Sequence, residues 1–151
     1  MQALYTTSVI LHVLAACTWV GALVFFAAVV IPTVRREEYA TVRAQLVRAV
    51  GGRYRILGWI SLSVLVATGL TNLLLRGFGY DALSSASFWR TDFGRTLAQK
   101  LVFVALALLS TAAHDFFALR SRRVSSWLGR ATLVFSLGAV VFAEYLVRGM
   151  P

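Results

Sequence analysis

The apolar stretch at residues 9–31, VILHVLAACTWVGALVFFAAVVI, decides the fold of this chain. A run of about 20 apolar residues is long enough to cross a bilayer as an α-helix. His12 interrupts this run, and on a helix it shares one face with Trp19, seven residues later. An imidazole within a membrane helix is costly, so it normally faces the protein interior or a cavity. His12 is therefore the first candidate for a functional group.

Three further apolar runs follow the first. The spans are predicted at residues 9–31, 56–75, 96–119 and 131–147. The chain has 151 residues, of which 59% are hydrophobic and 14% charged, and a soluble domain of this size would not usually contain four such runs. The pattern predicts an all-α polytopic membrane protein. We expect an antiparallel four-helix transmembrane bundle that forms a single domain over residues 1–151.

The segment between the first two spans is basic and has two interpretations. Pro32 marks the end or a kink of the first helix. Residues 33–55 then carry six arginines and an apolar stripe. They could form a short amphipathic helix that lies at the interface and is stopped by Gly51 and Gly52. Alternatively, they extend a membrane helix beyond the bilayer.

The distribution of arginine predicts the orientation. Residues 33–55 and the short connection 120–130 together hold ten arginines, whereas the polar, aromatic loop 76–95 and the C-terminal end hold only four. Basic loops stay in the cytoplasm, which predicts a bacterial inner-membrane protein with both termini outside. The net charge of +9 lies in these loops. Anionic lipid headgroups are therefore favoured as partners over nucleic acid.

One strongly polar residue on each span lies at a similar depth in the outer half. These residues are His12, Asn72, Lys100 and Glu144, and the helical rise places each about 8–12 Å from the midplane. They could satisfy one another, with Lys100 paired to Glu144 and His12 bonded to Asn72 or a backbone carbonyl. They could instead hold a ligand together.

The second histidine lies elsewhere. His114 is on the third span, roughly 20 Å from His12 along the membrane normal, so the two cannot both ligate one haem in a monomer. With Asp115 it is predicted to form an interfacial polar pair at the helix end. Cys17 is turned away from the face of His12, and no multi-ligand copper cage is visible in the sequence.

Three segments carry a resemblance to a known family. They are LHVLAACTWVGALVFFAAVVIP at 11–32, RYRILGWISLSVLVATGLTNLLL at 53–75, and FGRTLAQKLVFVALAL at 93–108. Their sequence resembles the four-helix membrane unit of the CopD-like copper-resistance proteins, in which a histidine is followed by tryptophan, glycine and a proline. The resemblance covers roughly residues 9–119. It implies a transition-metal or haem site in the outer half of the bundle.

A second resemblance concerns the first-helix histidine and the third-helix lysine. These are similar to residues of the HemJ-type protoporphyrinogen oxidases, which implies that His12 is a haem ligand and that Lys100 assists it. Together the resemblances suggest copper or haem b as the cofactor. His12 would be the metal ligand, with Trp19 beside it, and the cofactor-binding residues would also include Lys100, Asn72 and Glu144, which tune charge or hold a propionate-like group.

Three function classes follow, and whether the protein is an enzyme stays open. The leading expectation is a CopD-like protein for copper handling or haem-linked electron transfer. The second is a haem-dependent oxidoreductase that acts on a porphyrin or quinone. The third is a non-catalytic accessory subunit, in which the polar layer only fixes helix register. A homodimer and a membrane redox partner are further expectations.

Overall fold

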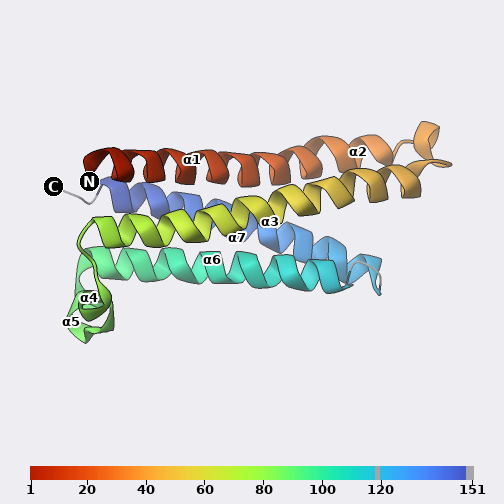
Figure 1. Ribbon diagram of the computed structural model, residues 1–151. Coiled ribbons are helices and arrows are strands. Elements are labelled where there is room, and N and C mark those ends of the chain that lie inside the picture. Colours follow the sequence, from red (N-terminus) through yellow and green to blue (C-terminus); the bar gives the residue numbers. More distant parts are fainter. Residues whose placement is uncertain (118–119, 149–151) are drawn as a thin grey trace. The chain divides into compact units, whose positions relative to one another are not determined.

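A computed structural model describes residues 1–117 and 120–148 (Figure 1). In this part of the chain every regular element is a helix and none is a strand. The chain divides into two compact units, Met1–Gly79 and Tyr80–Pro151. Each unit contributes two long helices, and each is described by itself.

The first unit is a helical hairpin. Its elements are α1 (Gln2–Phe25), the π-helix η1 (Phe26–Val30), α2 (Ile31–Val34), the 3-10 helix η2 (Glu37–Tyr39) and α3 (Arg43–Leu75). The two long helices run antiparallel, because the start of α1 lies beside the end of α3, and the end of α1 lies beside a residue nearer the start of α3. The rings of Phe26 and Tyr54 lie 5.1 Å apart at one end. At the other end the Arg76 Nε donates a hydrogen bond to the Tyr5 hydroxyl at 2.8 Å.

Pro32 changes the first helix without ending it. The helical course continues to Val34, with a π-helical segment at Phe26–Val30 just before the proline. A proline inside a helix has no N–H to donate to the preceding turn, and its ring crowds the carbonyl there. A local widening of the helix is one way to accommodate this defect. The first span is therefore longer than the predicted 9–31, covering Gln2–Val34.

From Arg43 onward the basic segment after Pro32 is a helical extension of the second span, as one of the two interpretations predicted. Helix α3 begins at Arg43 and runs unbroken through Gly51 and Gly52 to Leu75. The alternative, a separate interfacial helix stopped at the two glycines, is wrong. The turn before α3 is held by Arg43, whose Nε donates to the Val34 carbonyl at 2.6 Å. This bond satisfies a carbonyl at the C-terminal end of α2, which otherwise lacks a partner.

The second unit is also built on two long antiparallel helices. Its elements are α4 (Tyr80–Ser84), α5 (Ala86–Arg90), α6 (Asp92–Phe117) and α7 (Arg122–Arg148). Gly138 allows α6 and α7 to approach closely, because a Cβ there would lie only 2.5 Å from Phe103 Cδ1. Nearer the turn, Gly129 lies beside His114.

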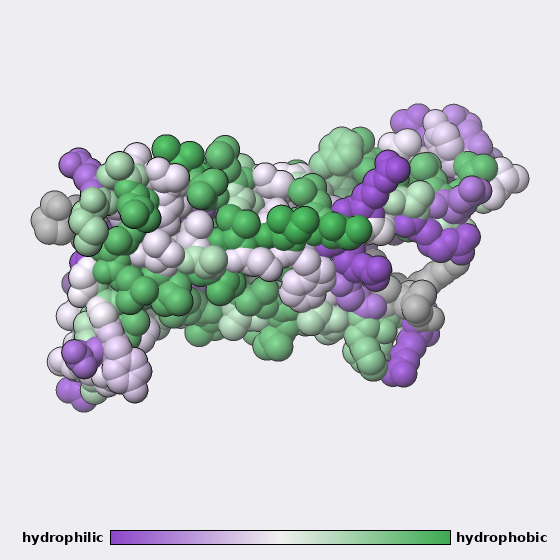
Figure 2. All heavy atoms as spheres, viewed as in Figure 1, coloured by the Kyte–Doolittle hydropathy of each residue, from purple (hydrophilic) through white to green (hydrophobic). Residues whose placement is uncertain are grey.

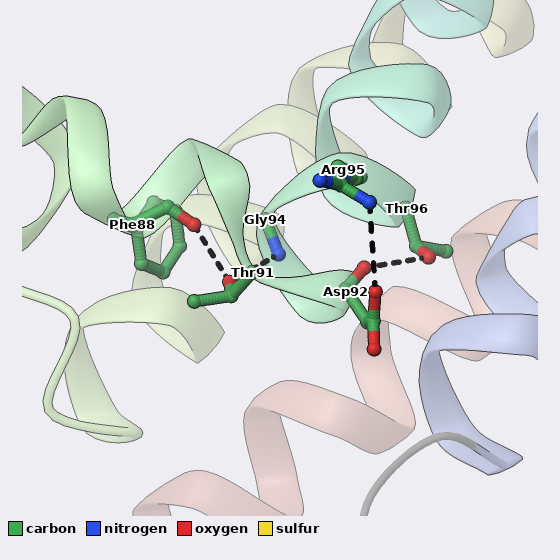
Figure 3. Close-up of polar contacts among 6 residues, drawn as sticks. All are labelled: Phe88, Thr91, Asp92, Gly94, Arg95 and Thr96. Atoms are coloured by element: carbon green, nitrogen blue, oxygen red, sulfur yellow. Dashed lines mark hydrogen bonds and ion pairs between the residues drawn. The ribbon is translucent and has the colours of Figure 1, made fainter.

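Threonine 91 fixes the start of α6 (Figure 3). Its Oγ1 accepts a hydrogen bond from the Gly94 N–H at 3.0 Å and donates one to the Phe88 carbonyl at 2.6 Å. This is the side-chain bond of a helix N-cap, which satisfies one of the donors left open in the first turn. A Cβ on Gly94 would overlap the Phe88 carbonyl oxygen. The cap starts α6 at Asp92, four residues before the predicted start of the third span.

Other predicted boundaries also shift. The predicted loop 76–95 contains the short helices α4 and α5. Most of the predicted connection 120–130 belongs to α7, which begins at Arg122. The predicted end of the third span at Leu119 lies outside the described residues. Hydropathy locates the apolar part of each helix but carries no information about how far its polar ends continue.

All four long helices are long and apolar enough to cross a membrane. Large apolar side chains point away from the helix contacts, with Leu14 57% and Leu109 67% exposed. Figure 2 shows hydrophobic side chains along the helices and hydrophilic ones gathered at their ends. Extensive exposed apolar surface of this kind marks a membrane protein. The prediction of an all-helical chain with four candidate spans is confirmed, whereas the packing of the two hairpins into one bundle stays a prediction.

Candidate functional site

His12 lies at the contact between α1 and α3, half-buried, with its ring against the second helix. Its Nδ1 is 2.8 Å from the Thr68 hydroxyl oxygen. Gly69 borders the ring, since a Cβ there would be 3.4 Å from His12 Cε1. A threonine hydroxyl therefore contacts His12 Nδ1 in the hairpin. The expected partners, Asn72 or a backbone carbonyl, do not supply this bond.

The Thr68 hydroxyl determines which imidazole nitrogen carries the proton. A hydroxyl has one proton to donate, and the Thr68 Oγ1 lies 2.6 Å from the Val64 carbonyl oxygen. Two oxygens at this distance require the proton between them. Thr68 must then accept a hydrogen bond from His12 Nδ1–H. In the neutral imidazole this leaves the lone pair on Nε2, the nitrogen that can bind a metal or accept a proton.

The His12–Thr68 bond is one of several polar contacts along the hairpin seam. Ser8 is buried, and its Oγ donates to the Thr68 carbonyl at 3.4 Å. Further out, Tyr5 accepts from Arg76, whose guanidinium carbon also lies 5.6 Å from the Tyr5 ring centroid. These contacts link residues more than 55 positions apart, so no local sequence pattern could have identified them. The only signal in the sequence was the uncharged polar stripe of Ser61, Thr68 and Asn72 along the second span.

Asn72 lies one helical turn beyond Thr68 on α3. Its Oδ1 is buried and has no hydrogen-bond partner among the described residues. An unsatisfied buried acceptor costs roughly 1–3 kcal/mol. Asn72 thus presents an acceptor next to the His12–Thr68 pair for a donor that the described chain does not provide.

Trp19 packs within the hairpin. Its side chain is 5% exposed, and it lies against Gly58 of α3, where an added Cβ would be 2.7 Å from Trp19 Cζ3. The absence of a side chain at Gly58 is what allows the indole to lie flush on the second helix. This contact gives Trp19 a packing role in the hairpin. Its predicted role beside a cofactor stays a prediction.

Lys100 and Glu144 belong to the second unit. Lys100 is half-buried on α6. Glu144 is exposed near the end of α7, and its Oε1 accepts from Arg148 Nε at 2.7 Å. Near both residues α6 and α7 border an open surface depression of about 300 Å³, lined by Thr96, Gln99, Phe142 and Tyr145. Because His12 and Asn72 belong to the first unit, a polar layer that joins all four residues stays a prediction.

The other side chains of types that can ligate a metal are not grouped into a site. Over residues 1–117 and 120–148, no group of three or more His, Cys, Asp or Glu side chains could hold a metal ion. Cys17 is exposed. His114 Nδ1 lies 3.6 Å from Asp115 Oδ1, which confirms the predicted pair at the end of the third span. His12 therefore stands as a single imidazole rather than as part of a multi-ligand metal cluster.

Comparison with known proteins places the chain beside one bacterial relative. A protein of Aquifex aeolicus (strain VF5), described as an uncharacterized protein, is 30% identical over 135 residues, and the match covers 84% of each chain. No family model matches the sequence. No solved structure matches it either.

Proposed function

This chain belongs to the same family as the Aquifex aeolicus protein, and we propose that it is an integral membrane protein that binds haem b through His12. The observation that supports the proposal is the hydrogen bond from His12 Nδ1 to Thr68. A histidine that ligates a metal usually donates a hydrogen bond from its second ring N–H to a neighbouring acceptor, which fixes the tautomer and the ring orientation. Here that acceptor is itself anchored to Val64.

The donor set fits haem better than copper. Haem iron is held by its porphyrin and needs only one or two protein ligands, of which imidazole is a common one. A soft copper site needs several sulfur or imidazole ligands together, and the described residues contain no group of three or more His, Cys, Asp or Glu side chains that could hold a metal ion. When bound, haem b would supply one-electron transfer. His12 would hold the iron.

The proposal includes a topology. The two hairpins form an antiparallel four-helix bundle in the bacterial inner membrane, with both termini outside and the arginine-rich turns in the cytoplasm. The role proposed for Lys100, which is half-buried on α6, is the one that the resemblance to the HemJ-type proteins implies: it would assist His12 by compensating an anionic group of the cofactor. Glu144 contributes less, because it is already paired with Arg148 and exposed.

The chain offers a matched pair of histidines for the test. The full-length protein is purified in detergent from cells supplied with haem, and its absorption spectrum is recorded oxidised and reduced. We expect a haem b spectrum that is lost in His12→Ala and retained in His114→Ala. Both substitutions remove an imidazole from a membrane helix, so only the site differs. A colourless wild-type protein from haem-replete cells contradicts the haem proposal, and stoichiometric copper in that sample favours copper handling.

A second candidate function is that of an accessory subunit without a cofactor. It is favoured by the fact that His12 and Ser8 have bonding partners on α3 and Tyr5 has one at Arg76, directly after α3, which is what a helix-registering seam requires. A protein that carries neither haem nor copper, and whose His12→Ala variant only loses thermal stability, supports this function.

A further inference from the structure

At the end of the first hairpin, where α2 meets α3, an apolar helix surface lies beside a helix surface that carries arginines. The Phe26–Tyr54 ring contact and the Arg43–Val34 hydrogen bond fix its register. Between them, the apolar sequence FAAVVIPTV lies alongside RAQLVRAVGGRY. One helix at this level is therefore apolar and its neighbour is basic.

Both sides are exposed. Phe25 is 58% and Val29 46% exposed on the apolar side. On α3 the arginines Arg48, Arg53 and Arg55, here named the basic collar, are also exposed. Arg43 is excluded from the collar because its guanidinium is bonded to backbone carbonyls of the turn. Figure 2 shows hydrophilic side chains gathered at this end of α2 and α3.

The lengths of the helices place this end at the membrane surface. Helix α3 has 33 residues, which corresponds to about 50 Å at 1.5 Å per residue, against about 30 Å of hydrocarbon. The apolar part of α3 begins at Ile56, directly after Arg55. Judged from α3 alone, the hydrocarbon edge lies at Ile56 and the basic collar lies directly outside it, in the headgroup layer.

Neither water nor hydrocarbon alone solvates both the apolar residues of α2 and the arginines of α3 at this level. A bilayer edge drawn at Ile56 leaves the apolar residues up to Val34 in water, whereas an edge drawn beyond Val34 buries the arginines. Phospholipids resolve the conflict, because their tails cover apolar surface while their phosphates meet guanidinium groups. We propose that the basic collar binds the phosphate groups of anionic phospholipids at the membrane surface.

The charges around the collar are consistent with this ligand. The acidic residues of the hairpin are Glu37 and Glu38, which lie in the turn next to Arg35 and Arg36. They offset those two arginines and leave the positive charge of the collar in excess. Nucleic acid would also be attracted to the arginines, but it would leave Phe25 and Val29 uncovered. A lipid covers both sides of the hairpin.

The test compares lipid classes on the full-length protein in detergent. Native mass spectrometry counts bound lipids in equimolar phosphatidylglycerol and phosphatidylcholine. We expect the wild type to prefer phosphatidylglycerol, and the triple variant Arg48→Gln, Arg53→Gln, Arg55→Gln to lose that preference by about tenfold or more, since each arginine near an anionic surface contributes roughly fivefold. The control removes the same charge elsewhere, with Arg90→Gln, Arg95→Gln and Arg148→Gln, and should change the preference less than about twofold.

Three results would overturn the proposal. One is an equal loss in both triple variants, which indicates a general effect of net charge. Another is displacement of phosphatidylglycerol by millimolar inorganic phosphate, which identifies free phosphate as the ligand. The third is tighter binding of a single-stranded oligonucleotide than of phosphatidylglycerol to the same collar. A triple Arg→Lys variant separates misfolding from loss of binding, because it keeps the charge and should keep most of the lipid preference.

Discussion

At the scale of single residues, the hydroxyl of Thr68 controls the chemistry of His12. It donates its only proton to the Val64 carbonyl and therefore accepts from the imidazole. The consequence is a single preferred neutral tautomer, with the proton on Nδ1 and the lone pair on Nε2. Thr68 would therefore act on a ligand only through His12. Its contribution is best separated from packing by substitutions that keep the shape.

The first prediction concerns this hydroxyl. Thr68→Val keeps the branched shape but removes the acceptor, so we expect both neutral tautomers of His12 to become populated. Thr68→Ser should restore the wild-type state. The measurement is the ¹⁵N chemical shift of the imidazole nitrogens in a His114→Gln background, where His12 is the one remaining histidine. If haem is bound, Thr68→Val should also weaken it by about 10–100-fold, as for other outer-shell substitutions.

Unchanged ¹⁵N shifts in haem-free Thr68→Val would contradict the assignment of the tautomer; the comparison uses haem-free protein because iron at Nε2 would itself keep the proton on Nδ1. The NMR measurement therefore does not depend on the proposed function. Loss of haem with unchanged shifts would instead place Thr68 in the packing of the site.

The second prediction concerns two glycines of the first hairpin. At Gly58 a Cβ would lie 2.7 Å from the Trp19 ring, whereas at Gly21 nothing lies within 4 Å. Gly58→Ala should lower stability by about 1–3 kcal/mol through overpacking. Gly21→Ala should be neutral or slightly stabilising, because alanine has the higher helix propensity. Thermal unfolding in detergent measures both, and an equal loss in the two variants would refute the close packing at Trp19.

At the scale of the elements, the N-cap of α6 offers the third prediction. Thr91→Ala removes the side-chain acceptor for the Gly94 N–H and should cost about 1 kcal/mol. The control is Thr96→Ala, since Thr96 only bonds a carbonyl within its own helix and is expected to matter less. Amide hydrogen exchange at the start of α6 reports the difference. Equal exchange in both variants would show that Thr91 does not hold this helix end.

Sequence identified the elements well and their ends poorly. Long apolar runs are a strong signal, because a bilayer demands one helix of fixed minimum length. The extension of α3 from Arg43 to Tyr54 lies outside the apolar run, so hydropathy did not decide between the two interpretations. Gly51 and Gly52 suggested a stop, but a glycine inside a helix costs only about 1 kcal/mol relative to alanine. The helical residues before and after the two glycines form one continuous helix, and its stability outweighs that cost.

The candidate site was predicted in part. A histidine in an apolar run stands out, and His12 does lie at a helix contact. Its partner could not be predicted, because serine and threonine are common in membrane helices and only the register of α1 against α3 selects Thr68. Trp19 shows the opposite case. Trp19 packs against Gly58 in the structure, and sequence spacing alone does not distinguish such a packing role from contact with a ligand.

At the scale of the whole molecule, the distribution of arginine leads to the fourth prediction, on topology. Cys17 is the only cysteine, so a Cys17→Ala chain is a clean background for new ones. A membrane-impermeant maleimide should label Arg90→Cys in intact cells. Arg36→Cys should be labelled only after the membrane is permeabilised, because its basic loop stays inside. The reverse pattern would invert the proposed orientation.

The unbroken course of α3 has a mechanical consequence. Arg53 and Thr68 lie on the same uninterrupted helix, separated by about four turns. A stiff rod transmits tilt and rotation along its length, so a force applied to its charged end also turns the end that carries the threonine. We therefore expect the thickness and charge of the surrounding membrane to affect the orientation of the His12 imidazole through α3.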